Sequence, residues 1–229
     1  MFGSWEKALK GMDNIANEFI GADDIETETQ DYSMRGFAST ARIATEYGWR
    51  QACDIKVGDR VFTFDNGLQV VKSVSRGTHF VASDSMPDFT SPLHVPMHAL
   101  GNEEPMILLP EQVVMLESDV AEDLIGDPFA LIPAKLLVGF RGIERFRSLH
   151  PVEMVTLHFE DDEVIYADGG ALMLSPAAAE GIAMMDVFDG TALPAPYTVW
   201  KGDDARKLID SIAEEDARAH GFMQMSTVA

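Results

Sequence analysis

Short apolar runs separated by turn-forming residues recur from residue 36 to about residue 175 of this chain. Runs of about four to eight residues, punctuated by Gly, Pro, Asn and Asp, are typical of β-strands and are too short for buried helices. The clearest runs are residues 60–64, 68–74, 129–132, 152–159 and 164–167. The pattern predicts an all-β domain that consists of many short strands.

Two pairs of these runs are expected to form hairpins. Asn66-Gly67 is typical of a type I′ turn, which requires a positive φ at both central residues. The acidic residues 160–162 separate the last two runs and predict a second hairpin. Residues 93–99 are apolar but contain Pro96, which cannot donate a backbone hydrogen bond and favours an edge strand or a loop.

The N-terminal region has the pattern of an amphipathic helix over residues 5–20. Its apolar residues recur at spacings of three and four, which places them on one face. This stripe consists of Trp5, Leu9, Met12, Ala16 and Phe19. Residues 22–34 contain five acidic and no basic side chains, which predicts an extended linker. The stripe is expected either to fold back on the domain or to bind a partner protein or a second copy, and the sequence leaves both open.

Two further helices are expected in the rest of the chain. Ser118 is a candidate N-cap for residues 119–125, which Gly126 would end. Residues 203–220 have a second amphipathic pattern, with acidic residues at the start and basic residues at the end. The predicted organisation is a helix at 1–21, an acidic linker at 22–35, a β domain at 36–176 and a C-terminal extension at 177–229.

The charge balance excludes several classes of partner. The chain has 17 Lys and Arg against 38 Asp and Glu, for a net charge of -21. Such a chain repels phosphate backbones and anionic lipid surfaces, so we expect no nucleic-acid binding. No window approaches the roughly 18 apolar residues that are needed to span a membrane, so we expect no membrane insertion. A single cysteine excludes an intramolecular disulfide, and the N-terminus has no signal-peptide run. We expect a cytoplasmic protein or one exported by a leaderless route.

Four patches of the β region resemble one known family. They read TARIAT with Gly48, ACDIKVGDRV, LGN followed by LPEQVV, and LHFEDDEVIYADG. Their order and spacing resemble the Hint domain, the self-processing module of inteins and Hedgehog proteins, in its bacterial stand-alone form. The resemblance implies an all-β fold, a horseshoe of bent strands, flanked here by N- and C-terminal helices.

The resemblance also implies a set of catalytic positions. In the family, a thiol or hydroxyl on the first residue attacks the preceding carbonyl, and a motif histidine acts on the scissile amide nitrogen. A further histidine in the last hairpin often assists, and inteins end in a His-Asn pair. Here the corresponding positions are Gly36, Gln112, Glu163 and Met173-Leu174. We interpret Gly36, Gln112 and Glu163 as vestigial positions, which predicts no self-cleavage.

Other candidate sites have simpler interpretations. Ser39 lies near the vacant nucleophile position, but three residues of strand move a side chain by about 10 Å. Cys53 lies in an apolar lead toward Gly58 and is expected to be a small buried residue. His94 and His98 have the spacing of ligands on a helix, but Pro96 lies between them, so no metal site and no cofactor are expected.

Three functional classes remain open at this point. The preferred one is a catalytically silent Hint-type domain that acts as a protein-interaction or assembly module, with a protein partner or a homo-oligomer. Its candidate interaction residues are Trp5, Leu9, Met12 and Phe19. The alternatives are self-processing by a non-standard nucleophile such as Ser39, and binding of a small ligand or metal in the vestigial cleft.

Overall fold

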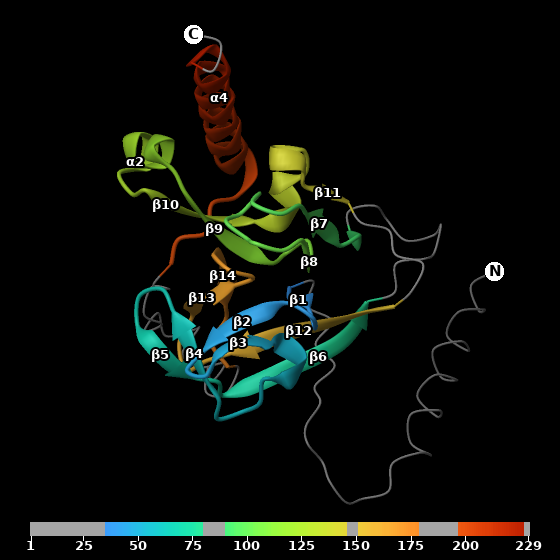
Figure 1. Ribbon diagram of the computed structural model, residues 1–229. Coiled ribbons are helices and arrows are strands. Elements are labelled where there is room, and N and C mark those ends of the chain that lie inside the picture. The colour runs from blue at the N-terminus through green and yellow to red at the C-terminus, as the bar shows by residue number, and fades with distance from the viewer. Residues whose placement is uncertain (1–34, 80–89, 146–150, 179–196, 227–229) are drawn as a thin grey trace, which may run out of the picture.

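The computed structural model describes residues 35–79, 90–145, 151–178 and 197–226. Within these ranges the chain forms two antiparallel sheets and one long C-terminal helix (Figure 1). The predictions of an all-β domain and of a C-terminal helix are therefore confirmed. The predicted helix at 5–20 and the linker at 22–34 lie outside the described residues.

The smaller sheet joins segments from distant parts of the chain. In spatial order its strands are β11 (Glu144–Arg145), β7 (Leu93–Val95), β8 (Met106–Leu108), β1 (Phe37–Ala38), β12 (Val152–His158) and β6 (Ser73–His79). β1 lies between two partners, because Phe37 pairs with both Leu108 and Val155. Residue 36 is therefore held at the centre of this sheet.

The larger sheet forms the second layer. In spatial order its strands are β10 (Phe129–Pro133), β9 (Val113–Glu117), β14 (Ala171–Ser175), β13 (Glu163–Ala167), β2 (Arg42–Thr45), β4 (Arg60–Thr63) and β5 (Gly67–Val70). β3 (Gly48–Gln51) pairs with β2 outside this path. β9 lies beside β14, which brings residue 112 at the start of β9 close to the end of the β domain.

Alternation along the strands explains how the two clusters of apolar side chains form. In β9, Val114 and Leu116 belong to the main core, whereas Val113 and Met115 pack in a second cluster on the other face. A strand that is covered on both faces reads as an uninterrupted apolar run, as this one does. The main core also contains large, fully buried side chains from both sheets, including Phe37, Ile43, Ile55, Phe159 and Ile165.

The helices cover one end of the sheets. Ser118 caps α2 (Asp119–Ile125) by accepting a hydrogen bond from the Val120 amide, and Gly126 ends it in a left-handed conformation, as predicted. α4 (Gly202–Ser226) packs against α2 and two 3-10 turns, η3 (Ala134–Leu137) and η4 (Phe140–Gly142). A third 3-10 turn, η1 (Ala52–Asp54), follows β3. Among the described residues, no helix is both long and apolar enough to cross a lipid bilayer.

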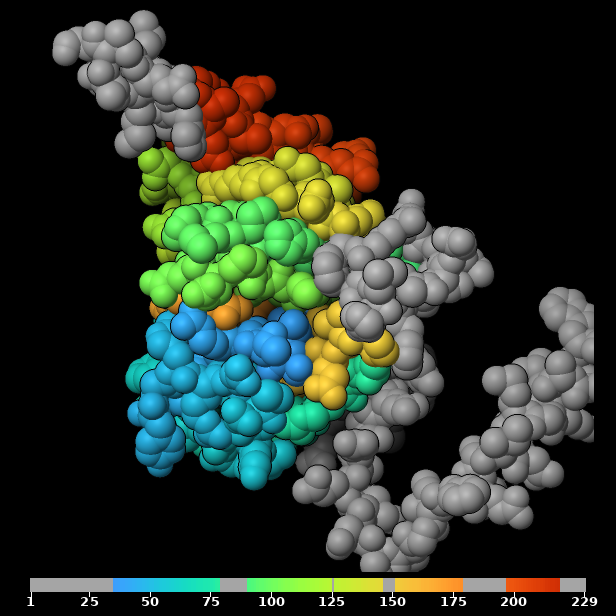
Figure 2. All heavy atoms as spheres, turned by 45° about the vertical axis from the view of Figure 1, so that its right-hand side comes forward, coloured from blue at the N-terminus to red at the C-terminus, as the bar shows by residue number. Residues whose placement is uncertain are grey.

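α4 and residues 35–79 lie at opposite ends of the molecule. Ala205, Leu208, Ile209 and Ile212 bury the inner face of α4. Figure 2 shows α4 above the middle segments of the chain, with residues 35–79 gathered at the other end. We refer to residues 35–79, which contain β1 to β6 and η1, as the N-terminal lobe.

The predicted hairpin across residues 160–162 is wrong. β12 pairs with β6 and β1 in the smaller sheet, whereas β13 pairs with β14, β2 and β4 in the larger one. The acidic loop therefore carries the chain from one sheet to the other. Alternation along each run specified a strand, but it did not specify the neighbour with which the strand would pair.

The first hairpin forms at the predicted place, but with a different turn. Thr63 pairs with Gly67, which leaves the three residues 64–66 in the loop. Gly67 has a φ of +67°, whereas Asn66 is not among the residues with positive φ, so the type I′ prediction is wrong. A glycine in the left-handed region at the end of a three-residue loop is the next common solution. The return run at 68–74 is also divided, because β5 ends at Val70 and β6 begins at Ser73.

The prediction for residues 93–99 also needs correction. β7 pairs with β11 on one side and with β8 on the other, so it is not an edge strand. Only Leu93–Val95 are in the strand, and Pro96 follows directly after its end. The proline thus limits the length of the strand rather than excluding it from the interior of the sheet.

Candidate functional site: the Arg35–Gly36 peptide and Gln112

Gly36 lies immediately before β1 in a conformation that only glycine adopts easily. Its φ is +128°, and its carbonyl accepts a hydrogen bond from the Leu109 amide at 2.9 Å. A Cβ atom at this position would lie 2.9 Å from both Thr156 Oγ1 and the Val155 carbonyl oxygen. Backbone strain and the surrounding atoms therefore both oppose a side chain here.

Gln112 is buried and uses every hydrogen-bonding group of its amide except one lone pair. Its Oε1 accepts a hydrogen bond from the Gly36 amide at 3.0 Å. Its Nε2 donates to the carbonyls of Val113 at 3.0 Å and Leu174 at 2.9 Å. The side chain thus connects residue 36 to the region around residue 174, where the resemblance placed the family's terminal pair. An amide can bridge these groups but cannot carry a proton near neutral pH.

Thr156 completes the hydrogen bonding of the peptide bond before Gly36. Its hydroxyl donates to the Arg35 carbonyl at 3.2 Å. The Arg35–Gly36 peptide is therefore held at its oxygen by Thr156 and at its nitrogen by Gln112. Sequence reasoning missed Thr156. The available signal was a polar residue between Val155 and Leu157 in a buried strand, because a buried hydroxyl needs a partner.

Glu163 does not join Gly36 and Gln112. It is buried at the start of β13, and both of its carboxylate oxygens accept hydrogen bonds from Asn66 Nδ2 at 3.0 and 3.1 Å. In the same loop, Asp65 accepts a hydrogen bond from the Tyr197 hydroxyl. Burial, followed by the Asp65 carboxylate, raises the pKa of Tyr197 well above its usual range. Glu163 thus contributes to a separate polar cluster that fastens the β4–β5 loop.

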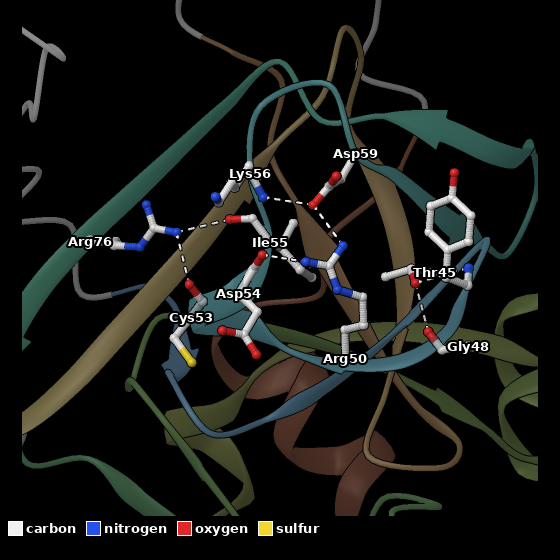
Figure 3. Close-up of polar contacts among 10 residues, drawn as sticks. Thr45, Gly48, Arg50, Cys53, Asp54, Ile55, Lys56, Asp59 and Arg76 are labelled. Atoms are coloured by element: carbon white, nitrogen blue, oxygen red, sulfur yellow. Dashed lines mark hydrogen bonds and ion pairs between the residues drawn. The ribbon is translucent and has the colours of Figure 1, made fainter.

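Cys53 is exposed, which corrects the prediction that it would be buried. In η1 the buried residue is Ala52, and the next position points outward. Figure 3 shows Cys53 and Ile55 with their carbonyls directed at the Arg76 guanidinium, which donates to them at 3.3 and 2.9 Å. Ser39 lies in the turn after β1, where its amide donates to the Glu153 carbonyl and its carbonyl accepts from the Cys53 amide.

The two histidines considered as metal ligands lie in different settings. His94 is in β7, whereas His98 is in the following turn with a φ of +67°. In the described ranges, no group of three or more His, Cys, Asp and Glu side chains could hold a metal ion.

Asp168 is a second buried polar residue of the β domain. Its Oδ1 accepts a hydrogen bond from the Arg42 amide at 2.9 Å, and its own amide donates to the Arg42 carbonyl at 2.7 Å. Its Oδ2 is buried without a hydrogen-bond partner among the described residues. Burial raises the pKa of Asp168 above its ordinary value, although the Arg42 amide and guanidinium act in the opposite direction.

Comparison with solved structures reveals a group of intein-like domains. A bacterial intein-like domain from Clostridium thermocellum is 15% identical, with a TM-score of 0.43 over 62% of this chain and 99% of that chain. The MchDnaB-1 intein (N145AA) is 14% identical, with a TM-score of 0.40 over 62% of this chain and 99% of its own. The gp41-1 intein is 11% identical, with a TM-score of 0.38 over 62% and 98%. No curated protein matches this chain.

The family comparison covers the part of the chain that contains Gly36, Gln112 and Glu163. The model of the Hint domain family matches residues 35–173. This match spans more than half of the 229 residues and begins at the residue before Gly36. This chain belongs to the Hint domain family.

Proposed function

We propose that this chain is a Hint domain that neither cleaves nor splices itself and that serves as a protein-interaction or assembly module. The observation that carries the proposal is the hydrogen bond from the Gly36 amide to Gln112 Oε1. At the position of the family's nucleophile there is no side chain. At the position of the family's histidine there is an amide that holds the peptide nitrogen without a proton to transfer.

The surroundings of Gly36 support the same conclusion on steric grounds. A cysteine or serine at this position would place its Cβ within 2.9 Å of a backbone oxygen, the Val155 carbonyl. A flexible side chain can move away from such a contact, but a strand backbone cannot do so at low cost. Restoring a nucleophile would therefore require a local change in the pairing of β1 with β12.

The hydrogen bonds of the Arg35–Gly36 peptide support a structural role for it. Thr156 donates to its oxygen, Gln112 accepts from its nitrogen, and the next carbonyl accepts from Leu109. Both N–H bonds of the Gln112 side chain are already donated to main-chain carbonyls, which leaves no donor for a ligand. We therefore favour a peptide that fastens the two sheets over a peptide that is cut and over a ligand-binding cleft.

Intact-mass spectrometry tests the catalytic part of the proposal. The full-length chain, incubated with a thiol or with hydroxylamine, is expected to stay one species of unchanged mass, because no residue can form the ester or thioester that these reagents cleave. The matched variants are Gly36→Cys, Gln112→His and the two combined. We expect Gly36→Cys alone to remain uncleaved, because the proton-transfer group is missing. A fragment that ends at Arg35 in the natural protein would overturn the proposal. Cleavage at Ser39 would also overturn it and would support Ser39 as a displaced nucleophile.

The interaction role rests on the apolar stripe of residues 5–20. Buried Trp and Phe side chains are common anchors of helix-in-groove contacts, and this stripe contains Trp5 and Phe19. Full-length protein and its Trp5→Ser/Phe19→Ser variant would be compared by light scattering and by capture of partners. We expect the variant to keep its melting temperature and to lose the association. Equal association of the two proteins would exclude the stripe as the interaction element.

A further inference from the structure

The N-terminal lobe has a charge opposite to that of the rest of the chain. Residues 35–79 contain seven Lys and Arg against four Asp and Glu, within a protein of net charge -21. Residues 35–79 therefore have a small excess of positive charge, at the end opposite α4 (Figure 2), where Lys72 also pairs with Glu160 of the acidic loop. A basic surface of this kind favours an acidic partner.

An apolar row lies on the outer face of the larger sheet in this lobe. Trp49 is paired with Ala44, and Phe62 follows Val61, which pairs with Thr45, so Trp49 and Phe62 are on the same face. Val70, opposite Arg60, continues that face. The exposed fractions of Trp49, Phe62 and Val70 are 45%, 43% and 41%. We call Trp49, Phe62 and Val70 the apolar row.

The lobe also has exposed cations, one of which lies on the face of the apolar row. This cation is Arg60, two residues from Phe62, and its half-exposed guanidinium lies 3.8 Å from the Glu46 carboxylate. Lys56 is exposed in the loop that leads into β4, and Arg76 is exposed in β6. Within the described ranges neither forms an ion pair with a carboxylate. Figure 3 shows Arg76 against carbonyls instead, while Asp59 is taken by Arg50. The lobe thus combines exposed apolar side chains with two cations, Lys56 and Arg76, that no carboxylate of the described residues pairs with.

Residues 5–31 of the same chain have the complementary composition. Their first part contains the stripe of Trp5, Leu9, Met12, Ala16 and Phe19. Their second part contains Asp23, Asp24, Glu26, Glu28 and Asp31 without a basic residue. The order is apolar stripe, then acidic run, then Arg35, where the described lobe begins. If residues 5–31 fold back over the lobe, their acidic run passes the cations of the lobe. Their apolar stripe then reaches the apolar row.

We propose that residues 5–31 dock on the N-terminal lobe of their own chain, with the stripe on the apolar row and the acidic run beside Lys56 and Arg60. Fifteen residues separate Phe19, the last residue of the stripe, from Arg35. An extended chain of that length spans up to about 50 Å, enough to reach across a small domain. A tether of this length gives an effective concentration on the order of millimolar, which favours docking within one chain over docking between chains. This inference goes beyond the proposed function, because it means that a partner of the stripe must first displace the lobe.

Cys53 provides a direct test, because it is exposed, lies in the lobe and is the chain's single cysteine. A nitroxide spin label on Cys53 of the full-length protein would broaden the NMR resonances of nearby residues. We expect the resonances of residues 5–31 to be weaker with the nitroxide intact than in the same sample after the nitroxide has been reduced. The loss should diminish in Trp49→Ser/Phe62→Ser and in Lys56→Glu/Arg60→Glu, and also with added salt, which screens exposed charges. The control Lys201→Glu/Lys207→Glu, which makes the same charge change on and before α4, should leave the loss unchanged.

Three outcomes would overturn the docking. The first is no loss of intensity in residues 5–31. The second is a loss that neither the apolar nor the charge variants reduce, which would place the segment elsewhere. The third concerns a mixture of two kinds of chain: spin-labelled chains of natural isotope abundance, and isotope-enriched chains without a spin label. A loss of intensity that appears in this mixture, and not within one chain, would show docking between copies. None of these outcomes changes the mass of the protein, so they leave the test of self-cleavage independent.

Discussion

The side-chain oxygen of Gln112 accepts the amide proton of Gly36 at 3.0 Å across 76 positions of sequence. The same side chain donates to the Val113 and Leu174 carbonyls, so one buried amide joins β1, β9 and β14. The contact between the first residue of the β domain and the middle of the chain is therefore a hydrogen bond from a backbone amide to a side-chain amide.

Gln112→Leu is expected to destabilise the domain by about 2–5 kcal/mol, because it leaves the Gly36 amide and two carbonyls buried without partners. Urea denaturation measures the change in the free energy of unfolding. Gln69→Leu is the matched control, since Gln69 donates a single hydrogen bond, to the Asn66 carbonyl, at an exposed site. We expect that control to cost little. Equal losses in the two variants would mean that the buried amide network does not stabilise the fold.

Gly36→Ala is expected to cost more than Gly58→Ala. Both glycines have positive φ, +128° and +90°, so both substitutions cost about 1–3 kcal/mol of backbone strain. A Cβ at Gly58 meets no atom within 4 Å, whereas at Gly36 it meets the Val155 carbonyl at 2.9 Å. The difference between the two changes in melting temperature isolates the steric term. A smaller effect at Gly36 would show that β12 can move away.

Gly67→Val is expected to destabilise the domain by roughly 1 kcal/mol or more, because a β-branched residue resists the left-handed conformation. The φ of Gly67 is +67°, and a Cβ there would meet open space, so the cost is purely conformational. Gly77→Val is the control, since Gly77 lies in β6 with open space and no positive φ. Thermal melting should give a lower melting temperature for Gly67→Val than for Gly77→Val. Equal melting temperatures would contradict the left-handed conformation of Gly67 in the β4–β5 turn.

Asp168→Asn is expected to change how stability depends on pH. Burial raises the pKa of this carboxyl in the folded chain, so the unfolded chain loses its proton first. The contribution of Asp168 to stability is therefore complete below the unfolded pKa and is lost as the pH rises through the folded pKa. The variant lacks this loss, so its melting temperature relative to the natural protein should increase from about pH 3 to about pH 6.

The control for this pH series is Asp161→Asn, in the exposed loop between β12 and β13. This variant removes one charge at an exposed position, so it controls for the change in net charge. If the melting temperature of Asp168→Asn relative to the natural protein instead falls with rising pH, the ionised carboxylate and its Arg42 partner outweigh the burial of Asp168.

Local sequence was informative wherever one segment decides its own conformation. Ser118 and Gly126 mark the ends of α2 because a cap and a left-handed stop act on adjacent backbone groups. β10 was recognisable because residues 129–132 form a short apolar run, which is typical of a strand. Cys53 shows where local sequence was not informative. Adjacent residues of the 3-10 turn η1 point in different directions, so Ala52 is buried and Cys53 is exposed.

The sequence by itself determined that residue 36 has no side chain and that residue 112 has only an amide, and it identified the family through four patches. It also determined an acidic N-terminal run that precedes a basic lobe. Only the tertiary structure decided that Thr156 holds the Arg35 carbonyl, that Leu174 meets Gln112, and that β12 and β13 belong to different sheets. The reason is physical: these partners are 62 to 121 positions apart, and strand pairing between distant segments brings them together.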